Sequence, residues 1–487
     1  MDLLSRSPGQ LSVAAFTAYP WEHVLPTLRL VEPLRLAGIA LIQGNDMDQV
    51  APEKVSLADM VVIQRDFPRW ETAYQAVIQL ARSEGKPVIY EVDDLLLELP
   101  EDHPDRPIYY YSRTLLPMLR AILEADAVTA STPALRDYLL PFNPNVLLLP
   151  NYLVDDLWPP QASNIGSHTT AQADEGPLTI GYMGTTSHTA DLEMISDVLQ
   201  TVLDHYGEHL ILHFWGIQPP AGLRSHPSVQ WTPLQILDYS QFAAYFSQQK
   251  CDVFLAPLAV NRFNQVKSSI KYLEYSALGV PGVYSRITPY ESIVRHAETG
   301  MLASTPDEWE YCLHQLIDNP SLRVKIGSQA NQAVNQSWRL SGHADEWRTV
   351  YKQVALKDFA SNPADSNRRM SFSSMLNQLQ EWQAELEDRI VQERQVIQNL
   401  HSVISEKELQ IQQQASLIQQ QASLIQELRT RLDEIYHSRA GKITRSMWRL
   451  HLLLAPPGSR RERLWHKLTS SKNQADAIPT QETPDDS

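Results

Sequence analysis

Three things that this 487-residue sequence lacks narrow the kinds of protein it can be. It has only two cysteines, Cys251 and Cys312, whose spacing fits neither a metal knuckle nor a disulfide framework, which favours a reducing compartment. No stretch reaches the roughly 18 consecutive apolar residues of a membrane-spanning helix. The N-terminus lacks the basic segment and long apolar core of a signal peptide. We therefore expect a cytoplasmic protein, with at most a peripheral contact to the inner face of a membrane.

Positive charge is also scarce, except near the C-terminus. The formal net charge is −16, yet residues 437–472 carry nine Lys or Arg side chains against one acid, Glu462. That segment has a net charge of +8, which leaves −24 on the rest of the chain. An acidic body argues against general nucleic-acid binding, so no nucleic-acid partner is expected.

The first part of the chain alternates short apolar runs with amphipathic stretches. Apolar runs predict strands at 11–19, 60–66, 87–94, 126–132 and 146–151, and apolar residues at helical spacing predict helices at 25–37, 71–84 and 115–125. This alternation is typical of βαβ units and a parallel sheet that is covered on both faces. We assign residues 1–158 to a Rossmann-like domain and the polar stretch 159–177 to a linker.

A second alternation of the same kind follows. Strands are predicted at 178–184, 210–216, 252–258 and 281–285, and helices at 191–206, 238–249, 268–278, 308–318 and 322–337. We assign residues 178–355 to a second Rossmann-like domain. Two such α/β domains would face each other across a cleft at the carboxyl ends of their strands, where ligands bind in this architecture.

The C-terminal part has a different pattern. An apolar residue recurs every seven positions, at Ile390, Ile397, Ile404, Ile411, Ile418, Ile425 and Leu432. This period predicts a coiled coil over 371–437 and hence a homo-oligomer, the alternative being a single solvated helix. Residues 438–470 combine basic side chains with Trp and Leu, which predicts either a membrane-surface segment or a pair of partner-docking helices. Residues 471–487 are polar and are expected to be disordered.

The stretch 261–281 has the features of an anion site. A polar loop with Asn261, Arg262, Asn264 and Lys267 leads into a helix that starts at Ser268 and Ser269, whose hydroxyls can cap its free amides. Such a helix start, with a lysine nearby, suits a diphosphate. Glu274 shares a helix face with Lys267 and Lys271, and its carboxylate can accept both hydroxyls of a ribose. The alternative is an ordinary capped helix with an exposed Lys–Glu pair.

Four segments resemble a known family. LEYSALGVPGVYS (273–285) is similar to the E-A-x-A-x-G-x-P-V-V segment of family-4 glycosyltransferases, which have the GT-B fold. DAVTASTPAL (126–135), VLLLPNYLVDDLW (146–158) and LTIGYMGTTSHTADLE (178–193) resemble its other motifs in the same order. The resemblance covers about residues 11–350 and implies that Glu274 binds the ribose of a sugar nucleotide. Residues 263–274 further resemble the F-N-x-x-K-S-x-x-K-x-x-E pattern of a bacterial group linked to O-antigen and other surface polysaccharides.

The chain departs from the family at two places. Val266 stands where the family often carries a second Glu, and 185–188 read Thr-Thr-Ser-His where its Arg/Lys pair is expected. Lys267, with Ser268 and Ser269, is the expected substitute for the missing donor contacts. The turn at Gly184 and Thr185 can approach the diphosphate through its backbone, and His188 can donate to it, the alternative being a capping or surface histidine.

On the acceptor side, Asp93 and Asp94 follow a predicted strand at the ligand edge of the first sheet. Either acid can orient or deprotonate an acceptor hydroxyl, and His103 in the next loop is a second candidate base. The alternative for the two acids is capping of a helix at LLLEL. The sequence shows no Asp-x-Asp motif near the cleft, so we expect no metal and no cofactor, the nucleotide sugar being a substrate.

Together these features predict transfer of a sugar from a nucleotide donor to a polysaccharide or lipid-linked acceptor, with retention implied by the resemblance. The alternative is a non-catalytic scaffold of the same fold that organises a surface-polysaccharide assembly through its coiled coil. Val266, in place of the family's second Glu, is the reason for considering it. A sugar-nucleotide epimerase is less favoured.

Overall fold

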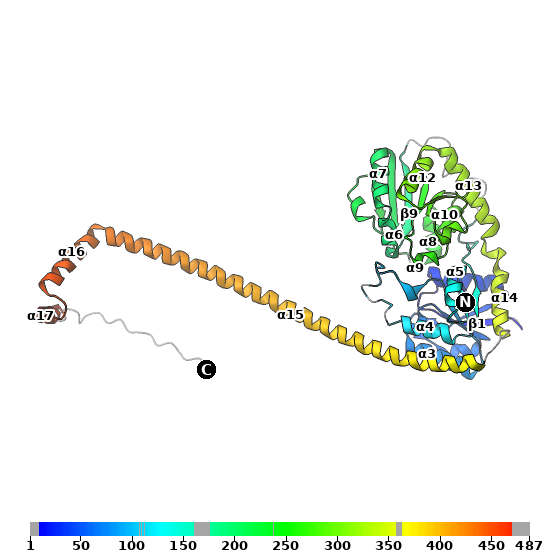
Figure 1. The fold of residues 1–487 in the computed structure, drawn as a ribbon, viewed down its shortest axis with the longest axis horizontal. Helices are drawn as coiled ribbons and strands as arrows, with labels where there is room; N and C mark the ends of the chain where they lie inside the picture. Colours follow the sequence, from blue (N-terminus) through cyan, green and yellow to red (C-terminus); the bar gives the residue numbers. More distant parts are fainter. Residues whose placement is uncertain are drawn as a thin grey trace. The chain divides into compact units, whose positions relative to one another are not determined.

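The computed structural model describes residues 9–159, 176–356 and 363–469, apart from positions 107, 109, 112 and 237. Most of the predicted linker and the whole predicted disordered tail therefore lie outside the described residues. The chain divides after Leu386 into an α/β unit and a helical unit, which are described separately (Figure 1).

The first sheet of the α/β unit is parallel and six-stranded, in the order β2-β1-β5-β6-β7-β8. Its strands are β1 (Ser12–Phe16), β2 (Ala40–Gln43), β5 (Met60–Gln64), β6 (Val88–Val92), β7 (Ala127–Ala130) and β8 (Val146–Leu148). The five predicted strands are confirmed, whereas β2 was not predicted. Residues of β1, β5, β6 and β7 are buried throughout, because helices cover both faces of the sheet.

The predicted helices at 71–84 and 115–125 are confirmed, the one at 25–37 is divided by a π-helical turn, and the helix at Pro133–Leu139 was not predicted. The helices of this half are α1 (Val24–Pro26), α2 (Glu32–Ala37), α3 (Glu71–Ser83), α4 (Leu115–Glu124) and α5 (Pro133–Leu139), with a π-helical turn over Thr27–Val31 and a small antiparallel pair, β3 (Asn45–Asp46) and β4 (Gln49–Val50). Gly38 and Gly85 follow α2 and α3 with φ of 69° and 66°, a left-handed backbone that glycine adopts freely.

The second sheet is also parallel and six-stranded, in the order β11-β10-β9-β12-β13-β14. Its strands are β9 (Leu178–Gly184), β10 (Leu210–Gly216), β11 (Val229–Thr232), β12 (Val253–Ala256), β13 (Gly282–Ser285) and β14 (Met301–Ala303). Its helices are α6 (Thr189–Glu193), α7 (Ser196–Tyr206), α8 (Tyr239–Phe246), α9 (Arg262–Gln265), α10 (Ile270–Ala277), α11 (Thr288–Glu291), α12 (Pro306–Asp318) and α13 (Pro320–Ser337). The predicted helix at 191–206 is two helices, and β11 and β14 were not predicted.

The two halves are joined by a helix near the end of the α/β unit. α14 (Ala344–Ala355) falls in the range that we assigned to the second domain, yet it packs against α2 of the first. Nε of Arg348 donates to the carbonyl of Ala37 at 2.9 Å. The chain thus returns to the first domain, and Figure 1 shows α13 and α14 running beside both sheets.

α15 (Pro363–His437) begins in the α/β unit and continues beyond Leu386 as the main part of the helical unit. It is followed by α16 (Arg439–Leu454) and α17 (Arg460–Thr469). The seven heptad residues from Ile390 to Leu432 lie on α15, and their exposed fractions run from 43% to 65%. The long helix is confirmed, while its association with a second copy stays a prediction. Among the described residues, no helix is both long enough and apolar enough to cross a membrane.

Candidate active site

A cleft of about 430 Å³ opens between the carboxyl ends of the strands of the two sheets. Nine of the twelve residues that the sequence put forward line it: Asp93, Asp94, Gly184, Thr185, His188, Lys267, Ser268, Lys271 and Glu274. His103, Asn264 and Ser269 are not part of its lining. The cleft therefore brings the predicted donor residues and the two acids of the first domain to one place.

Glu274 projects from α10 into this cleft and is almost fully buried. Its Oε1 accepts a hydrogen bond of 2.8 Å from the hydroxyl of Tyr239, which in turn accepts one of 3.0 Å from Nε1 of Trp158. Burial raises the pKa of Glu274 to about 7, against the opposing effects of Tyr239 and Lys271. A buried carboxylate fixed through one oxygen is well prepared to accept hydrogen bonds from a diol.

Two lysines border the cleft beside Glu274. Nζ of Lys271 donates to the carbonyl of Met183 at 2.6 Å, and burial lowers the pKa of Lys271 to about 8, with Lys267 acting in the same direction and Glu274 opposing. Nζ of Lys267 lies 4.6 Å from the centre of the Phe263 ring, and burial lowers its pKa too. Two partly buried ammonium groups at one cleft favour an anion, because its charge would offset their desolvation.

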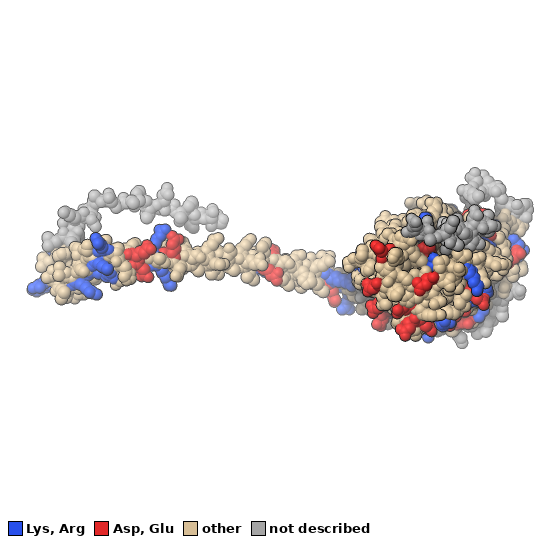
Figure 2. Space-filling view, turned by 90° about the horizontal axis from the view of Figure 1, so that it is seen from above, with Lys and Arg blue, Asp and Glu red and all other residues tan. Residues whose placement is uncertain are grey.

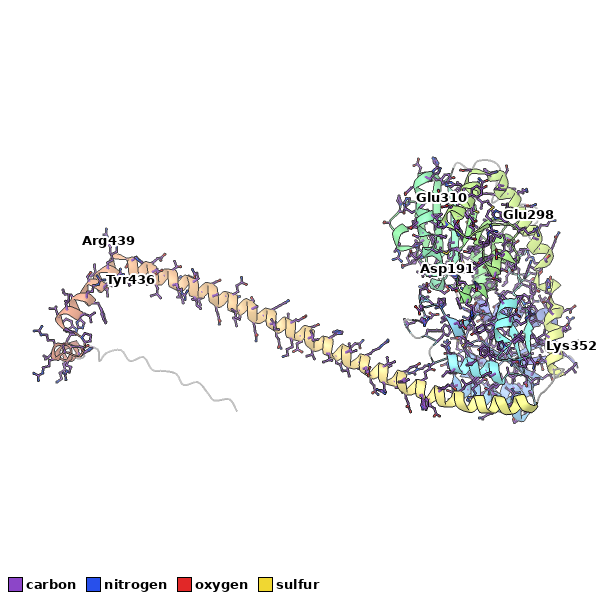
Figure 3. The ribbon with its side chains drawn as sticks, in the orientation of Figure 1. Asp191, Glu298, Glu310, Lys352, Tyr436 and Arg439 are labelled. Carbon is purple, nitrogen blue, oxygen red and sulfur yellow. The ribbon has the colours of Figure 1, made fainter. Side chains whose placement is uncertain are left out.

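His188 stands at the same wall, in the turn after β9. Its Nδ1 lies 2.8 Å from Oδ2 of the buried Asp191 (labelled in Figure 3), whose Oδ1 accepts hydrogen bonds from the amide of Ala259 at 2.7 Å and from Nδ2 of Asn264 at 2.8 Å. Burial, together with Lys267 and Lys271, lowers the pKa of His188 to about 3.

The ionisation of this pair follows from these contacts. Burial alone would raise the pKa of Asp191, but the hydrogen bonds it accepts hold the pKa below its usual value. An ionised carboxylate can only accept, so the neutral imidazole of His188 carries its proton on Nδ1 and presents Nε2 as the free ring nitrogen.

The glycine at the end of β9 keeps this wall open. A Cβ on Gly184 would lie 2.8 Å from Cε1 of Tyr182, so a larger residue would force the strand end to shift. Gly184 and Thr185 line the cleft next to Lys271, as expected for a turn that meets a ligand through its backbone.

Two residues of the polar loop have structural contacts in place of the expected ones. Nδ2 of Asn264 donates hydrogen bonds to Asp191 and to the carbonyl of Ala259. Asn264 therefore stabilises the loop and does not face the cleft. The expected helix capping is wrong as well: Ser269 begins α10 without a side-chain cap, and Oγ of Ser268 accepts a 2.9 Å hydrogen bond from Nδ2 of Asn151. Asn151 belongs to the first domain, so Ser268 links the two halves.

Asp93 and Asp94 follow β6 and face the cleft from the other side. Nη1 of Arg65 lies 3.2 and 3.3 Å from the two oxygens of Asp93 and 3.8 Å from Oδ2 of Asp94. Burial raises the pKa of Asp93 to about 7 although Arg65 opposes it. The side chain of Asp94 is the more exposed, at 27% against 11%. The short helix over Leu96–Glu98 has no side-chain cap, so the capping alternative for the two acids is wrong.

His103 and Val266 meet at the junction of the two halves. The His103 ring packs edge-on against Phe263, with 5.5 Å between centroids, and its Nδ1 accepts from the amide of Asp105. Phe263 and Val266 are buried in the apolar core of the first domain, and Oγ1 of Thr132 donates to the carbonyl of Val266 at 2.7 Å. The valine in place of a family glutamate is thus a packing residue, and His103 is placed behind the cleft.

Sequence reasoning missed Asp191, Tyr239, Arg65 and Asn151. The sequence gives one weak indication of Asp191, because a residue three positions after His188 in a short helical segment lies on the same face. The other three come from distant parts of the chain, and only the fold brings them to the cleft.

Residues 177–319, from β9 to the end of α12, match the family model described as glycosyl transferases group 1. The second domain is thus similar in sequence to group 1 glycosyltransferases. The matched segment holds His188, Lys267 and Glu274 and agrees with the expected enzyme class. No curated protein matches the sequence significantly.

Solved structures agree on the fold. Sucrose-phosphate synthase of Thermosynechococcus elongatus superposes with a TM-score of 0.51 at 15% identity, over 71% of this chain and 99% of its own. HepE of Anabaena, solved with UDP and glucose, superposes with a TM-score of 0.47 at 14% identity, over 71% of this chain and 98% of its own. The two parallel sheets and the similarity to sucrose-phosphate synthase show the GT-B arrangement, as predicted.

Proposed function

We propose that this glycosyltransferase moves a sugar from a nucleoside-diphosphate donor, held by Lys267, Lys271 and Glu274, to a hydroxyl of a polysaccharide or lipid-linked acceptor that lies over Asp93 and Asp94. The observation that carries the proposal is the arrangement around one cleft of two partly buried lysines, a buried carboxylate and a histidine. The cations suit a diphosphate, and the carboxylate suits the ribose next to it.

The departing diphosphate is the centre of the proposed mechanism. When the bond between C1 of the sugar and the β-phosphate oxygen breaks, its electron pair stays on that oxygen. The ammonium groups of Lys267 and Lys271 stabilise the charge that develops there. The phosphates also raise the pKa of His188, so that Nε2 takes up a proton and donates to the diphosphate, while Asp191 holds the ring through Nδ1.

The acceptor is activated from the opposite wall. We assign the proton of the acceptor hydroxyl to Asp94, because Arg65 engages both oxygens of Asp93 and leaves Asp94 the freer carboxylate. The acceptor oxygen then forms the new bond to C1 as the diphosphate leaves. The family resemblance implies retention of configuration, and we name no covalent nucleophile. The scaffold alternative rested on Val266 in place of a family glutamate. It is less favoured, because Val266 packs in the core of the first domain.

The cellular setting belongs to the same proposal. We place the enzyme at the cytoplasmic side, in the synthesis of a surface polysaccharide such as O-antigen, as a homo-oligomer joined through α15. The exposed heptad residues of α15 support the oligomer, and the F-N-x-x-K-S-x-x-K-x-x-E pattern supports the polysaccharide.

The test is a donor screen with the full chain. UDP-, GDP-, TDP- and ADP-sugars are each incubated with the protein, and the release of nucleoside diphosphate is measured. One donor class should be consumed, and Lys267→Met should abolish most of that release while Lys352→Met, on an exposed turn of α14, leaves it unchanged. Release from none of the four classes, with or without added glycan acceptors, would refute the proposal.

A further inference from the structure

The helix α16 carries an apolar stripe on one side. Ile443, Met447, Leu450 and Leu454 are spaced by four, three and four residues, which places all four on a single helix face. Their exposed fractions are 60%, 66%, 59% and 57%, so the described residues leave this face uncovered. A continuous exposed stripe of this size marks an interaction surface.

A basic flank runs beside the stripe. Lys442, Arg445 and Arg449 follow one another at helical spacing, and α16 contains no Asp or Glu. Arg445 lies over the ring of Tyr436, near the start of α16 where Figure 3 labels Tyr436 and Arg439. α17 adds Arg460, Arg461, Arg463 and Lys467 against the single acid Glu462. Figure 2 shows Lys and Arg side chains at this end of the helical unit.

The charge pattern decides between possible occupants of the stripe. A second copy of α16 would bring two basic flanks together without an acid on either helix to pair with them, and like charges at that spacing repel. A surface that is anionic and apolar at the same time satisfies both the flank and the stripe. The surface of an anionic bilayer has these two properties, and the exposed rings of Trp448 and Trp465 suit its interfacial zone.

We propose that α16 and α17 bind the surface of an anionic lipid bilayer, with the stripe of α16 among the acyl chains and the basic side chains at the headgroups. This inference stands apart from the proposed sugar transfer, because it uses none of the residues of the cleft. Of the two alternatives for residues 438–470, it favours the membrane-surface segment over partner-docking helices. The four residues that would enter the bilayer are Ile443, Met447, Leu450 and Leu454.

The test uses the full chain and sonicated vesicles in a co-sedimentation assay at physiological salt. The protein should pellet with vesicles of 70% phosphatidylcholine and 30% phosphatidylglycerol, and at least about tenfold less with pure phosphatidylcholine. Replacement of the stripe by Met447→Gln with Leu450→Gln should abolish pelleting. The matched control, Val260→Gln with Tyr311→Gln, removes exposed apolar side chains from the α/β unit and should pellet like the parent chain.

The basic flank is tested by charge reversal. Lys442→Glu with Arg445→Glu and Arg449→Glu should weaken binding to the anionic vesicles about 100-fold, while Arg389→Glu with Arg429→Glu and Arg431→Glu on α15 should not. Circular dichroism checks that each variant keeps its helix content. The proposal is overturned if the parent chain fails to bind anionic vesicles, or if the stripe variant binds as well as the parent. It is also overturned if the stripe variant changes the oligomer mass and leaves vesicle binding intact, since a second copy then covers the face.

Discussion

Nδ1 of His188 lies 2.8 Å from Oδ2 of Asp191, and the other oxygen of that carboxylate is held by the amide of Ala259 and the side chain of Asn264. These contacts fix His188 at the cleft wall, where burial, together with Lys267 and Lys271, lowers its pKa to about 3. At pH 7 the ring is neutral in the free enzyme. A diphosphate that neutralises Lys267 and Lys271 removes part of the cause of the low pKa, so ligand binding should raise the pKa of His188.

The coupling predicts proton uptake. Binding of the cognate nucleoside diphosphate should be accompanied by proton uptake, and affinity should rise as the pH falls. Titration calorimetry in two buffers of different ionisation enthalpy measures the number of protons. His188→Gln should bind the nucleotide without proton uptake. If this variant takes up as many protons as the parent chain, a group other than His188 is protonated.

Asp191→Asn tests the positioning part of the same relationship. An amide NH2 directed at Nδ1 would reverse the tautomer of His188, so kcat should fall about 100-fold and the proton uptake should change. The matched control is Asp197→Asn, an exposed acid on α7, which should leave both quantities unchanged.

The contact between Arg65 and Asp93 predicts a pH dependence of kcat. Asp94 is the proposed base, and its neighbour Asp93 has a pKa of about 7. The charge of ionised Asp93 should help Asp94 to attract the acceptor proton, so kcat at saturating donor should fall as the pH drops below about 7. Arg65→Gln removes the cation that favours ionisation, so this acid limb should move to higher pH. If the acid side of the pH profile of kcat does not move in Arg65→Gln, ionisation of Asp93 does not control the rate.

Much of the site could be predicted because it lies on one short stretch. Lys267, Lys271 and Glu274 share a helix face, so spacing alone places them together, and the cleft confirms it. Asp191, Tyr239 and Arg65 could not be found in this way, because parallel strands bring them in from separate crossovers. The serine caps failed for a related reason: the hydroxyl of Ser268 is taken by Asn151, more than a hundred residues away.

The fold followed from the strand pattern with similar limits. Strands buried on both faces, such as β5 and β12, were visible as apolar runs, whereas the edge strands β2 and β11 contain partly exposed residues and were missed. The predicted helix at 191–206 breaks at Met194 and Ile195, where local hydrophobicity continues without interruption.

Val266 gives a prediction on stability. Its side chain is buried in the apolar core of the first domain, so Val266→Glu should place a carboxylate without partners there and destabilise the protein by about 3 kcal/mol. Urea unfolding monitored by tryptophan fluorescence measures the change. Val260→Glu, at a position that is 75% exposed in the same loop, should be nearly neutral. Equal effects of the two substitutions would contradict the packing role of Val266.

The exposed heptad of α15 predicts association of copies. Ile411→Asn with Ile418→Asn interrupts two consecutive apolar layers and should convert an oligomer to a monomer, as measured by sedimentation velocity of the full chain. Gln413→Asn with Gln420→Asn, each two residues beyond a heptad isoleucine, should leave the mass unchanged. A parent chain that sediments as a monomer would show α15 to be a single solvated helix.

The donor assignment rests above all on Glu274, the buried carboxylate that Tyr239 fixes through one oxygen. Titration calorimetry of UDP, GDP, TDP and ADP against the parent chain and Glu274→Ala tests it most directly, with Glu298→Ala on an exposed loop as the control. One nucleotide should bind the parent chain, and Glu274→Ala should weaken it at least about 30-fold through the loss of charge-assisted hydrogen bonds to the ribose, while Glu298→Ala binds normally. Unchanged affinity in Glu274→Ala for every nucleotide that the parent chain binds would contradict the account.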